Sequence, residues 1–448
     1  MTSLVYPLMN KDLKNTAVPP LRFPEFCDTE GWEEMPLSNV AKLITEKTGA
    51  KSYTLMSVTA GIGLVSQIEK FGREIAGEAY KNYYVIKKGD FAYNKSSVKQ
   101  HPEGQIALLE NTDMGAVPNS IFTCFRVDEK YVSPYFLKYP FANNIHGKWL
   151  RKFISVGARA NGALNVDSKD LLALPIFLPS LAEQQKIASC LTSLDELITA
   201  QSQKLDALKV HKKGLMQQLF PADGETVPQL RFKEWRDTEG WESCKIGDFI
   251  ESHKGGAALT PTDFVSYSKC EVIPKKAITE GLWLKMSTEN PTYCSEDFFN
   301  DNLQSVVDST CLITTLRDLV PSGPSIGYIV KYTGEKKYIL AQGVYGLKTK
   351  ETLVSDFLIH FSNTPQYRKL MNAIMVGSTQ VHIRNGDFLN LPFNVPSKAE
   401  QQKIADCLSS LDDVIAAESE QLAAMKGHKK GLMQQLFPST EGVEASSE

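Results

Sequence analysis

A long internal repeat limits the possible architectures of this chain more than any other feature. The 43 residues of segment 179–221 align without gaps on segment 396–438, and 31 of them are identical. Residues 34–165 and 243–382, which precede the two copies, show little similarity to each other. This alternation of variable and repeated parts indicates one structural frame that presents two different modules.

Shorter repeats lie ahead of each variable part. The sequence VPPLRF at residues 18–23 returns as VPQLRF at 227–232, and DTEGWE at 28–33 returns unchanged at 237–242. Both pairs are 209 residues apart, whereas the long repeat has an offset of 217. The two modules therefore begin and end alike.

Each copy of the long repeat predicts a helix of about 60 Å, at about 1.5 Å per residue. The patterns Ser180-x-x-Glu183 and Ser397-x-x-Glu400 resemble capping boxes at the helix starts. Apolar residues then recur in steps of four and three, which is typical of a helix–helix seam. The seam residues are Ile187, Leu191, Leu194, Ile198, Leu205 and Leu208 in the first copy and Ile404, Leu408, Leu411, Ile415, Leu422 and Met425 in the second.

Polar residues interrupt the seam at the same places in both copies. Gln201 and Glu418 are equivalent, as are Lys212 and Lys429, and such residues can fix the register and the partner of a helix pair. Gly214 and Gly431 make a local break possible. A plain hairpin that only supports two domains would explain the helices. It would leave much of the apolar surface uncovered, so a partner that completes a bundle is favoured.

The variable parts predict mixed α and β structure, and hence an α+β protein. Apolar runs predict strands at residues 83–86, 106–109, 120–125, 326–330 and 338–340, and residues 135–149 and 357–375 predict helices. The expected divisions are an N-terminal extension 1–17, a first variable domain 18–178, a helix 179–221, a linker 222–226, a second variable domain 227–395, a helix 396–438 and an acidic tail 439–448.

Several classes of protein and site are disfavoured by the sequence. No run of about 18 apolar residues predicts a membrane span, and the first residues do not resemble a secretory signal. Eight cysteines occur without a C-x-x-C pair, which argues against structural zinc and disulfides and fits a cytoplasmic protein. Neither a phosphate-binding G-x-x-x-x-G-K-[ST] loop nor an H-E-x-x-H zinc motif is present. No metal site and no catalytic residue is therefore expected.

Charge is distributed in a way that permits nucleic-acid binding. The net charge of −3 equals the charge of the acidic tail, so the body of the chain is neutral. Residues 130–166 and 357–386 contain no acidic side chain, and both windows lie just ahead of a long helix. Acid-free basic surface in matched places favours contact with DNA phosphates, and Arg, Asn and Gln in Gly-rich loops could reach base edges. Solvated helix faces and turns would give the same composition for any single residue.

A third segment that could contact DNA, besides the two windows, is KKGDFAYNK at residues 87–95, whose counterpart in the second half is expected at 308–317. The candidate DNA contacts are Asn94, Lys95, Lys148, Arg151, Lys152, Arg159 and Asn161 in the first half, and Arg317, Arg368, Lys369, Gln380, His382 and Arg384 in the second.

These motifs together resemble the specificity (S) subunit of type I restriction–modification enzymes. The resemblance covers residues 18–438 and rests on the LRF…GWE openings, on KGDFAYNK at 88–95, on the L-P-x-x-x-P-S-x-x-E-Q-Q-K-I-A junctions and on the KKGLMQQLF endings. It implies two target-recognition domains that each read half of a bipartite, asymmetric site in double-stranded DNA. It also implies that the helices pair as an antiparallel coiled coil in a pseudo-two-fold monomer and set the spacing of the half-sites.

The resemblance further implies partners and cofactors. Two methyltransferase (M) subunits would dock on the helices and domains, and motor-nuclease (R) subunits would join them. This chain would bind no cofactor and would not be catalytic alone, whereas M would use S-adenosylmethionine and R would use ATP and Mg²⁺. Two alternatives stay open from the residues themselves, namely a helical scaffold without DNA specificity and a self-sufficient DNA-modifying enzyme.

Overall fold

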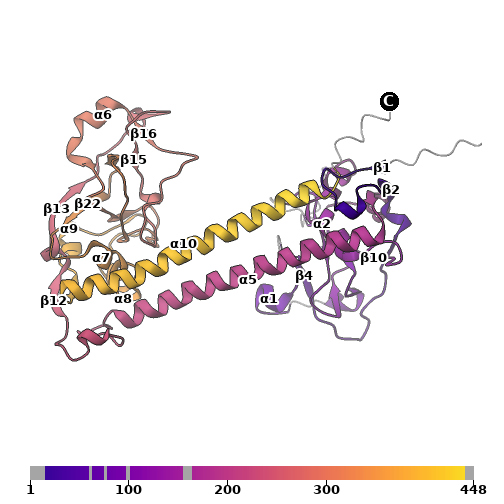
Figure 1. The fold of residues 1–448 in the computed structure, drawn as a ribbon, viewed down its shortest axis with the longest axis horizontal. Helices are drawn as coiled ribbons and strands as arrows, with labels where there is room; N and C mark the ends of the chain where they lie inside the picture. The colour runs from indigo at the N-terminus through magenta and orange to yellow at the C-terminus, as the bar shows by residue number, and fades with distance from the viewer. Residues whose placement is uncertain (1–15, 60–62, 75–77, 97–100, 155–163, 439–448) are drawn as a thin grey trace, which may run out of the picture. The chain divides into compact units, whose positions relative to one another are not determined.

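The computed structural model describes residues 16–59, 63–74, 78–96, 101–154 and 164–438 and forms two units (Figure 1). Unit 1 comprises residues 1–200 and 423–448, and unit 2 comprises residues 201–422. The long helices α5 (Leu181–Leu219) and α10 (Lys398–Gln435) each begin in one unit and end in the other. Each unit therefore contains a variable domain, the start of one long helix and the end of the other.

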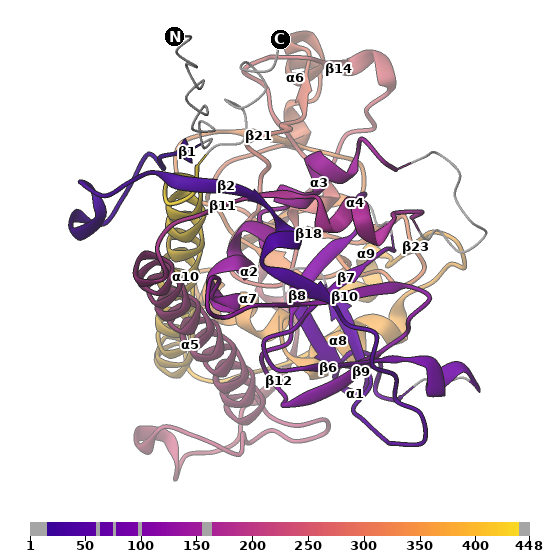
Figure 2. The same ribbon diagram turned by 90° about the vertical axis from the view of Figure 1, so that its right-hand side faces the viewer.

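Unit 1 is built on a four-stranded antiparallel sheet. The strand order is β3-β10-β7-β8, with β3 (Ala41–Leu43), β10 (Phe122–Val127), β7 (Phe91–Asn94) and β8 (Gln105–Leu108). Figure 2 shows β10, β7 and β8 of this sheet. Smaller antiparallel sheets flank it: β1 (Thr16–Ala17), β2 (Trp32–Pro36) and β11 (Pro175–Leu178); β4 (Met56–Thr59) and β5 (Gly63–Ser66); and β6 (Tyr84–Lys87) and β9 (Met114–Val117). The helices are α1 (Gln67–Phe71), α2 (Pro134–Ala142), α3 (Ile145–Leu150) and α4 (Ser168–Leu172).

Unit 2 repeats this plan with different strands. Its antiparallel sheet has the order β13-β22-β18-β20, with β13 (Ile250–Gly255), β22 (Val344–Thr349), β18 (Leu312–Thr315) and β20 (Ile329–Val330). Its other strands are β12 (Glu242–Lys245) with β24 (Pro392–Val395), β14 (Phe264–Val265) with β16 (Tyr293–Cys294), β15 (Val272–Ile273) with β21 (Tyr338–Leu340) and β17 (Val306–Val307), and β19 (Arg317–Asp318) with β23 (Val381–His382). The helices are α6 (Glu296–Asp301), α7 (Ser355–Ser362), α8 (Pro365–Ile374) and α9 (Asn385–Leu389).

The two predicted helices of the variable parts are each divided into two. Asn144, with φ of 59°, separates α2 from α3, because this left-handed conformation cannot continue a right-handed helix. In unit 2 the side chain of Thr364 accepts a hydrogen bond from the backbone of Tyr367 and caps α8, so a new helix begins where 357–375 had been expected to continue. The predicted strand at 326–330 is likewise shortened to β20, because Gly327 turns the chain with φ of 80°.

The long helices agree with the heptad pattern and remain unbroken at their glycines. α5 continues through Gly214 and α10 through Gly431, although glycine lowers helix stability by about 1 kcal/mol relative to alanine. At the end of α5, burial of Met216 and Leu219 in the unit 2 core offsets this cost. No helix among the described residues is long and apolar enough to cross a membrane.

The seam residues serve two kinds of packing. Ile187 and Leu191 join the core of the unit 1 domain, and Ile404 and Leu408 join that of unit 2. The remaining predicted seam residues (Leu194, Ile198, Leu205, Leu208, Leu411, Ile415, Leu422 and Met425) are buried or half-buried. The first seam residues of each long helix therefore fix that helix to its domain.

The polar interruptions of the seam bind polar partners on the other long helix of the antiparallel pair. In unit 2 the Gln201 amide donates to the Glu418 carboxylate at 2.5 Å, and Lys212 lies 2.5 Å from Asp412. In unit 1 Lys429 forms an ion pair with Asp195. A register shift would separate these polar side chains from their partners, so the interruptions specify the alignment of the helices.

Each helix start is tied to its domain by a buried ion pair that connects two repeated motifs. Both oxygens of the Glu183 carboxylate accept hydrogen bonds from Arg22 at 2.7 Å, and the indole of Trp32 donates to it at 3.2 Å. Arg231, Trp241 and Glu400 repeat the arrangement, with Arg231 to Glu400 distances of 2.8 and 2.9 Å. These contacts explain why the opening motif and the start of the long repeat are both duplicated.

The expected capping box is therefore only half present. Ser180 caps α5 by accepting from the backbone of Glu183 at 3.3 Å, as predicted, and Ser397 does the same for Glu400. The Glu183 side chain contacts Arg22 and Trp32 instead of the cap backbone. A buried arginine that would otherwise lack a counter-charge is the stronger partner.

Candidate nucleic-acid interface

In both units the acid-free window ends beside an equivalent strand of the main sheet. Near the end of the first window, the backbone N–H of Leu164 donates to the carbonyl of Lys95, directly behind β7, at 2.8 Å. Near the end of the second window, the N–H of Ile383 donates to the carbonyl of Leu316, directly behind β18, also at 2.8 Å. Because β7 and β18 hold the same place in their sheets, the frame brings the candidate reading segments to equivalent edges.

In unit 1 this edge carries two neighbouring carboxamides. Asn94 ends β7 and is paired in register with Gln105, the first residue of β8. Directly opposite residues of antiparallel strands have their side chains on the same face, about 5 Å apart. The Asn94 oxygen accepts a hydrogen bond from the backbone of Ser96 at 2.9 Å, which leaves its NH₂ group as a donor. Lys95 follows, with its backbone held by Ile121 and Leu164.

The predicted basic patch of unit 1 is less positive in space than in sequence. Arg151 donates from Nε to Glu103 at 2.6 Å, and Glu103 lies outside the acid-free window. Burial raises the pKa of the Glu103 carboxyl, but the hydrogen bonds that it accepts, chiefly from Arg151, have the larger combined effect. The pKa of Glu103 therefore lies below its ordinary value. The charge of Arg151 is therefore balanced within the protein, and the arginine closes the turn between β7 and β8.

The other candidates of unit 1 lie near this turn or outside the described residues. Lys148 on α3 and Lys152 behind it are exposed, and the Lys152 ammonium lies 5.6 Å from the centre of the Trp149 ring. Arg159 and Asn161 lie outside the described residues.

In unit 2 three of the predicted residues meet on one small ladder. Arg317 on β19 is paired in register with His382 on β23, and its guanidinium donates to the Gln380 oxygen at 3.4 Å. Gln380 and His382 are exposed, and Arg317 is half-buried. The ladder thus presents a cation, an amide and an imidazole beside the strand end that matches Asn94.

Lys275 adds a second cation to this ladder, although the sequence pattern gave no reason to select it. A Cβ on Gly343 would lie 2.8 Å from the Arg317 Cβ and 3.2 Å from the Lys275 Cε, so both side chains converge on this glycine. Burial, and then the charge of Arg317, lower the pKa of Lys275 below its ordinary value. Two adjacent cations repel each other, and an anion such as a DNA phosphate would relieve the repulsion.

The remaining candidates of unit 2 have internal partners or lie apart. The Arg368 guanidinium lies 4.0 Å from the centre of the Tyr328 ring and donates to the Ile326 carbonyl at 2.6 Å. Lys369 forms an exposed ion pair with Asp223 at 2.5 Å. Arg384 precedes α9 and is exposed. The internal contacts of Arg368 account for this arginine without a ligand.

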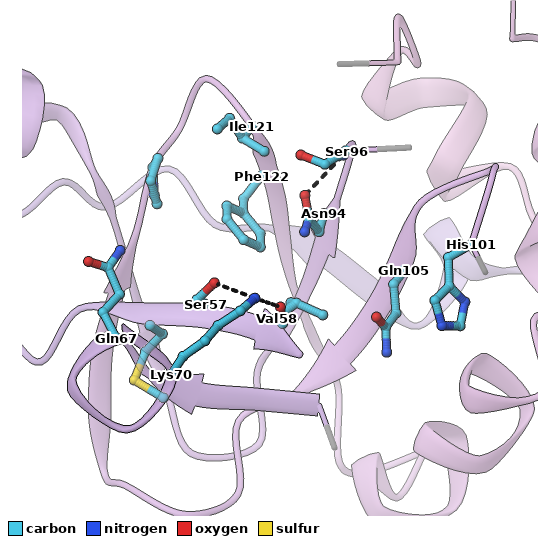
Figure 3. Close-up of a pocket in the computed structure, with 12 residues that line it drawn as sticks. Ser57, Val58, Gln67, Lys70, Asn94, Ser96, His101, Gln105, Ile121 and Phe122 are labelled. Atoms are coloured by element: carbon cyan, nitrogen blue, oxygen red, sulfur yellow. Dashed lines mark hydrogen bonds between the residues drawn. The ribbon is translucent and has the colours of Figure 1, made fainter. Parts of the chain in front are cut away.

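Two further features bear on chemistry. A recess of about 530 Å³ opens beside Asn94, between the β4–β5 hairpin and the end of the main sheet (Figure 3). Among the described residues, no group of three or more His, Cys, Asp or Glu side chains could hold a metal ion.

Comparison with known proteins agrees with this duplicated arrangement. The family described as "Type I restriction modification DNA specificity domain" matches residues 29–210 and again residues 238–426, which together make up most of the chain. The chain belongs to this family. The double match coincides with the duplication of the frame, and it identifies the protein as a DNA sequence-specificity subunit of a type I restriction–modification system.

Relatives of known type support this membership. The MjaVIII specificity subunit of Methanocaldococcus jannaschii is 24% identical over 292 residues, which cover 65% of this chain and 67% of that protein. The putative MjaX specificity subunit of the same organism is 22% identical over 418 residues, which cover 91% of this chain and 93% of that protein.

Solved structures show that the fold is shared. The S subunit from M. genitalium superimposes with a TM-score of 0.55 at 14% identity, covering 94% of this chain and 100% of that chain. A chain from a study of complex assembly and conformational transition in the type I system superimposes with a TM-score of 0.53 at 16% identity, covering 91% of this chain and 98% of that chain. The α+β fold with two long helices, expected for a specificity subunit, is confirmed.

Proposed function

We propose that each unit reads one half of a bipartite, asymmetric DNA site. The matched return of the two windows to the ends of β7 and β18 carries this proposal, because one frame then presents a reading edge twice. The side chains at these edges differ, with Asn94 and Gln105 in unit 1 and Arg317, Gln380 and His382 in unit 2. Carboxamides pair well with adenine and arginine with guanine, so the half-sites should differ in sequence.

A domain replacement tests this division of labour. Residues 34–170 would be replaced by the corresponding segment of a related specificity subunit, which leaves both long helices and all of the unit 2 domain intact. The methylated sites of a host that carries the gene and its methyltransferase partner would then be sequenced. One half-site should change while the other half and the gap stay the same. A change in both halves would contradict the proposal.

The two helices are proposed to set the gap between the half-sites. Seven residues inserted after Leu205 in α5 and seven after Ala416 in α10 would add two turns at opposed places, so Gln201 would still face Glu418 and Lys212 would still face Asp412. The addition lengthens each helix by about 10 Å, or about three base pairs. We expect a longer gap with unchanged half-sequences. Altered half-sequences with an unchanged gap would refute this role.

The subunit is also proposed to act through partners and to be non-catalytic alone. Two methyltransferase subunits would bind the helices and domains, and equivalent surfaces on the duplicated frame would suit two identical partners. Motor-nuclease subunits would complete the assembly. S-adenosylmethionine would be bound by the methyltransferase subunits, and ATP and Mg²⁺ by the motor-nuclease subunits. Methyl transfer by the isolated chain supplied with S-adenosylmethionine would overturn this assignment.

A further inference from the structure

The recess beside Asn94 has the composition of a binding site for a planar ring with polar edges. Buried apolar side chains of Met56, Val58 and Phe122 form its floor, and half-buried Ile121 lies at its rim. Its volume of about 530 Å³ falls within the range of roughly 300–1,000 Å³ that is typical of small-molecule pockets.

Polar groups converge on this apolar floor from several elements. Asn94 and Gln105 contribute carboxamides and His101 contributes an imidazole, and all three side chains are half-buried. Lys70 of α1 closes one side, where its ammonium donates to the Ser57 hydroxyl at 3.2 Å (Figure 3). Among the described residues no hydrogen bond satisfies the Gln105 carboxamide, so its donor and acceptor are available to a ligand.

The position of the recess favours a nucleobase over other rings. Asn94 belongs both to the recess and to the edge to which the first window returns, so DNA held at that edge lies next to the opening. A base that stays stacked presents only its edge at the bottom of a groove and cannot enter a recess in the protein. A base that has left the stack can enter, where apolar side chains cover its faces and amides bind its edge.

We propose that this recess binds one unstacked base of the half-site read by unit 1, with Gln105 and Asn94 as specificity-determining residues. The inference rests on the proposed function and adds a mode of reading to it. Unit 2 has no carboxamide at the equivalent strand position. There Thr315 is fully buried, and its hydroxyl donates to the carbonyl of Gly343 at 3.0 Å. The device would therefore belong to the first reader alone.

Base-by-base fluorescence can test this proposal in the assembled complex. The specificity subunit, bound to its methyltransferase partners, would be mixed with duplexes that carry 2-aminopurine at successive adenine positions of the site, and permanganate would report unstacked thymines. We expect a several-fold increase in 2-aminopurine fluorescence, or in permanganate reactivity, at one position of the unit 1 half-site. Methyltransferases also extrude their target base, so a signal from that base is expected as well.

Variants separate the two signals. Gln105→Leu keeps the side-chain size but removes the amide, and Ile121→Trp places bulk at the rim of the recess. Both should abolish the unit 1 signal while the signal of the target adenine remains, and Gln105→Leu should weaken DNA binding by about tenfold. Gln304→Leu, a change at an exposed glutamine of unit 2, is the matched control and should preserve both signals.

A mismatch arm distinguishes extrusion from reading in the groove. Changing only the base opposite the responding position lowers the cost of unpairing, so an extruded base should bind more tightly. Signals that all persist in Gln105→Leu, or a mismatch that weakens binding, would overturn the inference. Failure of the domain replacement described above, in contrast, would overturn the proposed division of the site itself.

Discussion

Removing the charge of Glu183 should destabilise unit 1 locally by about 3 kcal/mol. In Glu183→Gln the side chain keeps its shape, but one carboxylate oxygen becomes an NH₂ group that faces the Arg22 guanidinium, with which Glu183 makes two 2.7 Å bonds. The Glu183 and Arg22 side chains are 1% and 6% exposed, so water cannot replace the lost charge. Loss of one partner of a buried ion pair typically costs about 3–5 kcal/mol. Arg22 also donates to the carbonyls of Thr29 and Glu30, and these remaining bonds keep the expected cost at the lower end of that range.

Hydrogen exchange measured by mass spectrometry provides the assay and an internal control. A loss of about 3 kcal/mol corresponds to exchange about a hundredfold faster at the first turns of α5 if local opening limits exchange. The first turns of α10, anchored by Arg231 and Glu400, should keep their rate. Glu25→Gln removes an exposed carboxylate paired with Lys186 on α5, and this matched change should have little effect. Equal exchange in Glu183→Gln and Glu25→Gln would refute the reasoning.

Three further changes give distinct outcomes. Burial, and then Lys212 and Lys331, lower the pKa of His360 to about 3, so the folded state leaves it neutral while the unfolded chain protonates it below about pH 6.5. Stability should therefore fall by about 2 kcal/mol between pH 7.5 and 5 through this residue, and urea titrations of His360→Phe should lack that part of the slope. Gly343→Ala should weaken recognition of the unit 2 half-site because its Cβ meets Arg317, whereas Gly334→Ala, at a glycine that also has a positive φ but no neighbour within 4 Å, should not; methylome sequencing compares them. Arg368→Met should lower the free energy of unfolding, measured by thermal denaturation, by about 1–2 kcal/mol and leave the target sequence unchanged. A changed target sequence would assign Arg368 to the DNA interface.

Features encoded by local periodicity could be predicted from the sequence. The heptad stripe gave both long helices, since burial of one side repeats every two turns. The strands β6, β8, β10 and β21 were found because short apolar runs are bounded by turn residues. The break at Asn144 was missed because its left-handed conformation depends on local packing, and no sequence period marks it.

Pairing between distant residues could not be predicted. The sequence identified Glu183 as a capping residue, but its main partner is Arg22, 161 positions away. The acid-free window around Arg151 suggested a free cation, yet Glu103 reaches it from the turn before β8. Lys275 joins Arg317 only through the close approach at Gly343. Residue type and spacing therefore selected the candidate reading segments, whereas the balance of charge at them could be seen only in the fold.

The exchange of helix ends between the units has a consequence for biosynthesis. Phe437, just beyond α10, packs against Trp32 with ring centres 5.9 Å apart, and the carbonyl of Gln435 accepts a hydrogen bond from Leu21. The domain of unit 1 is therefore incomplete until the ribosome has synthesised Phe437, even though its own sheet was synthesised first. A nonsense mutation within the codons for α10 would damage a domain whose own sheet is encoded far upstream.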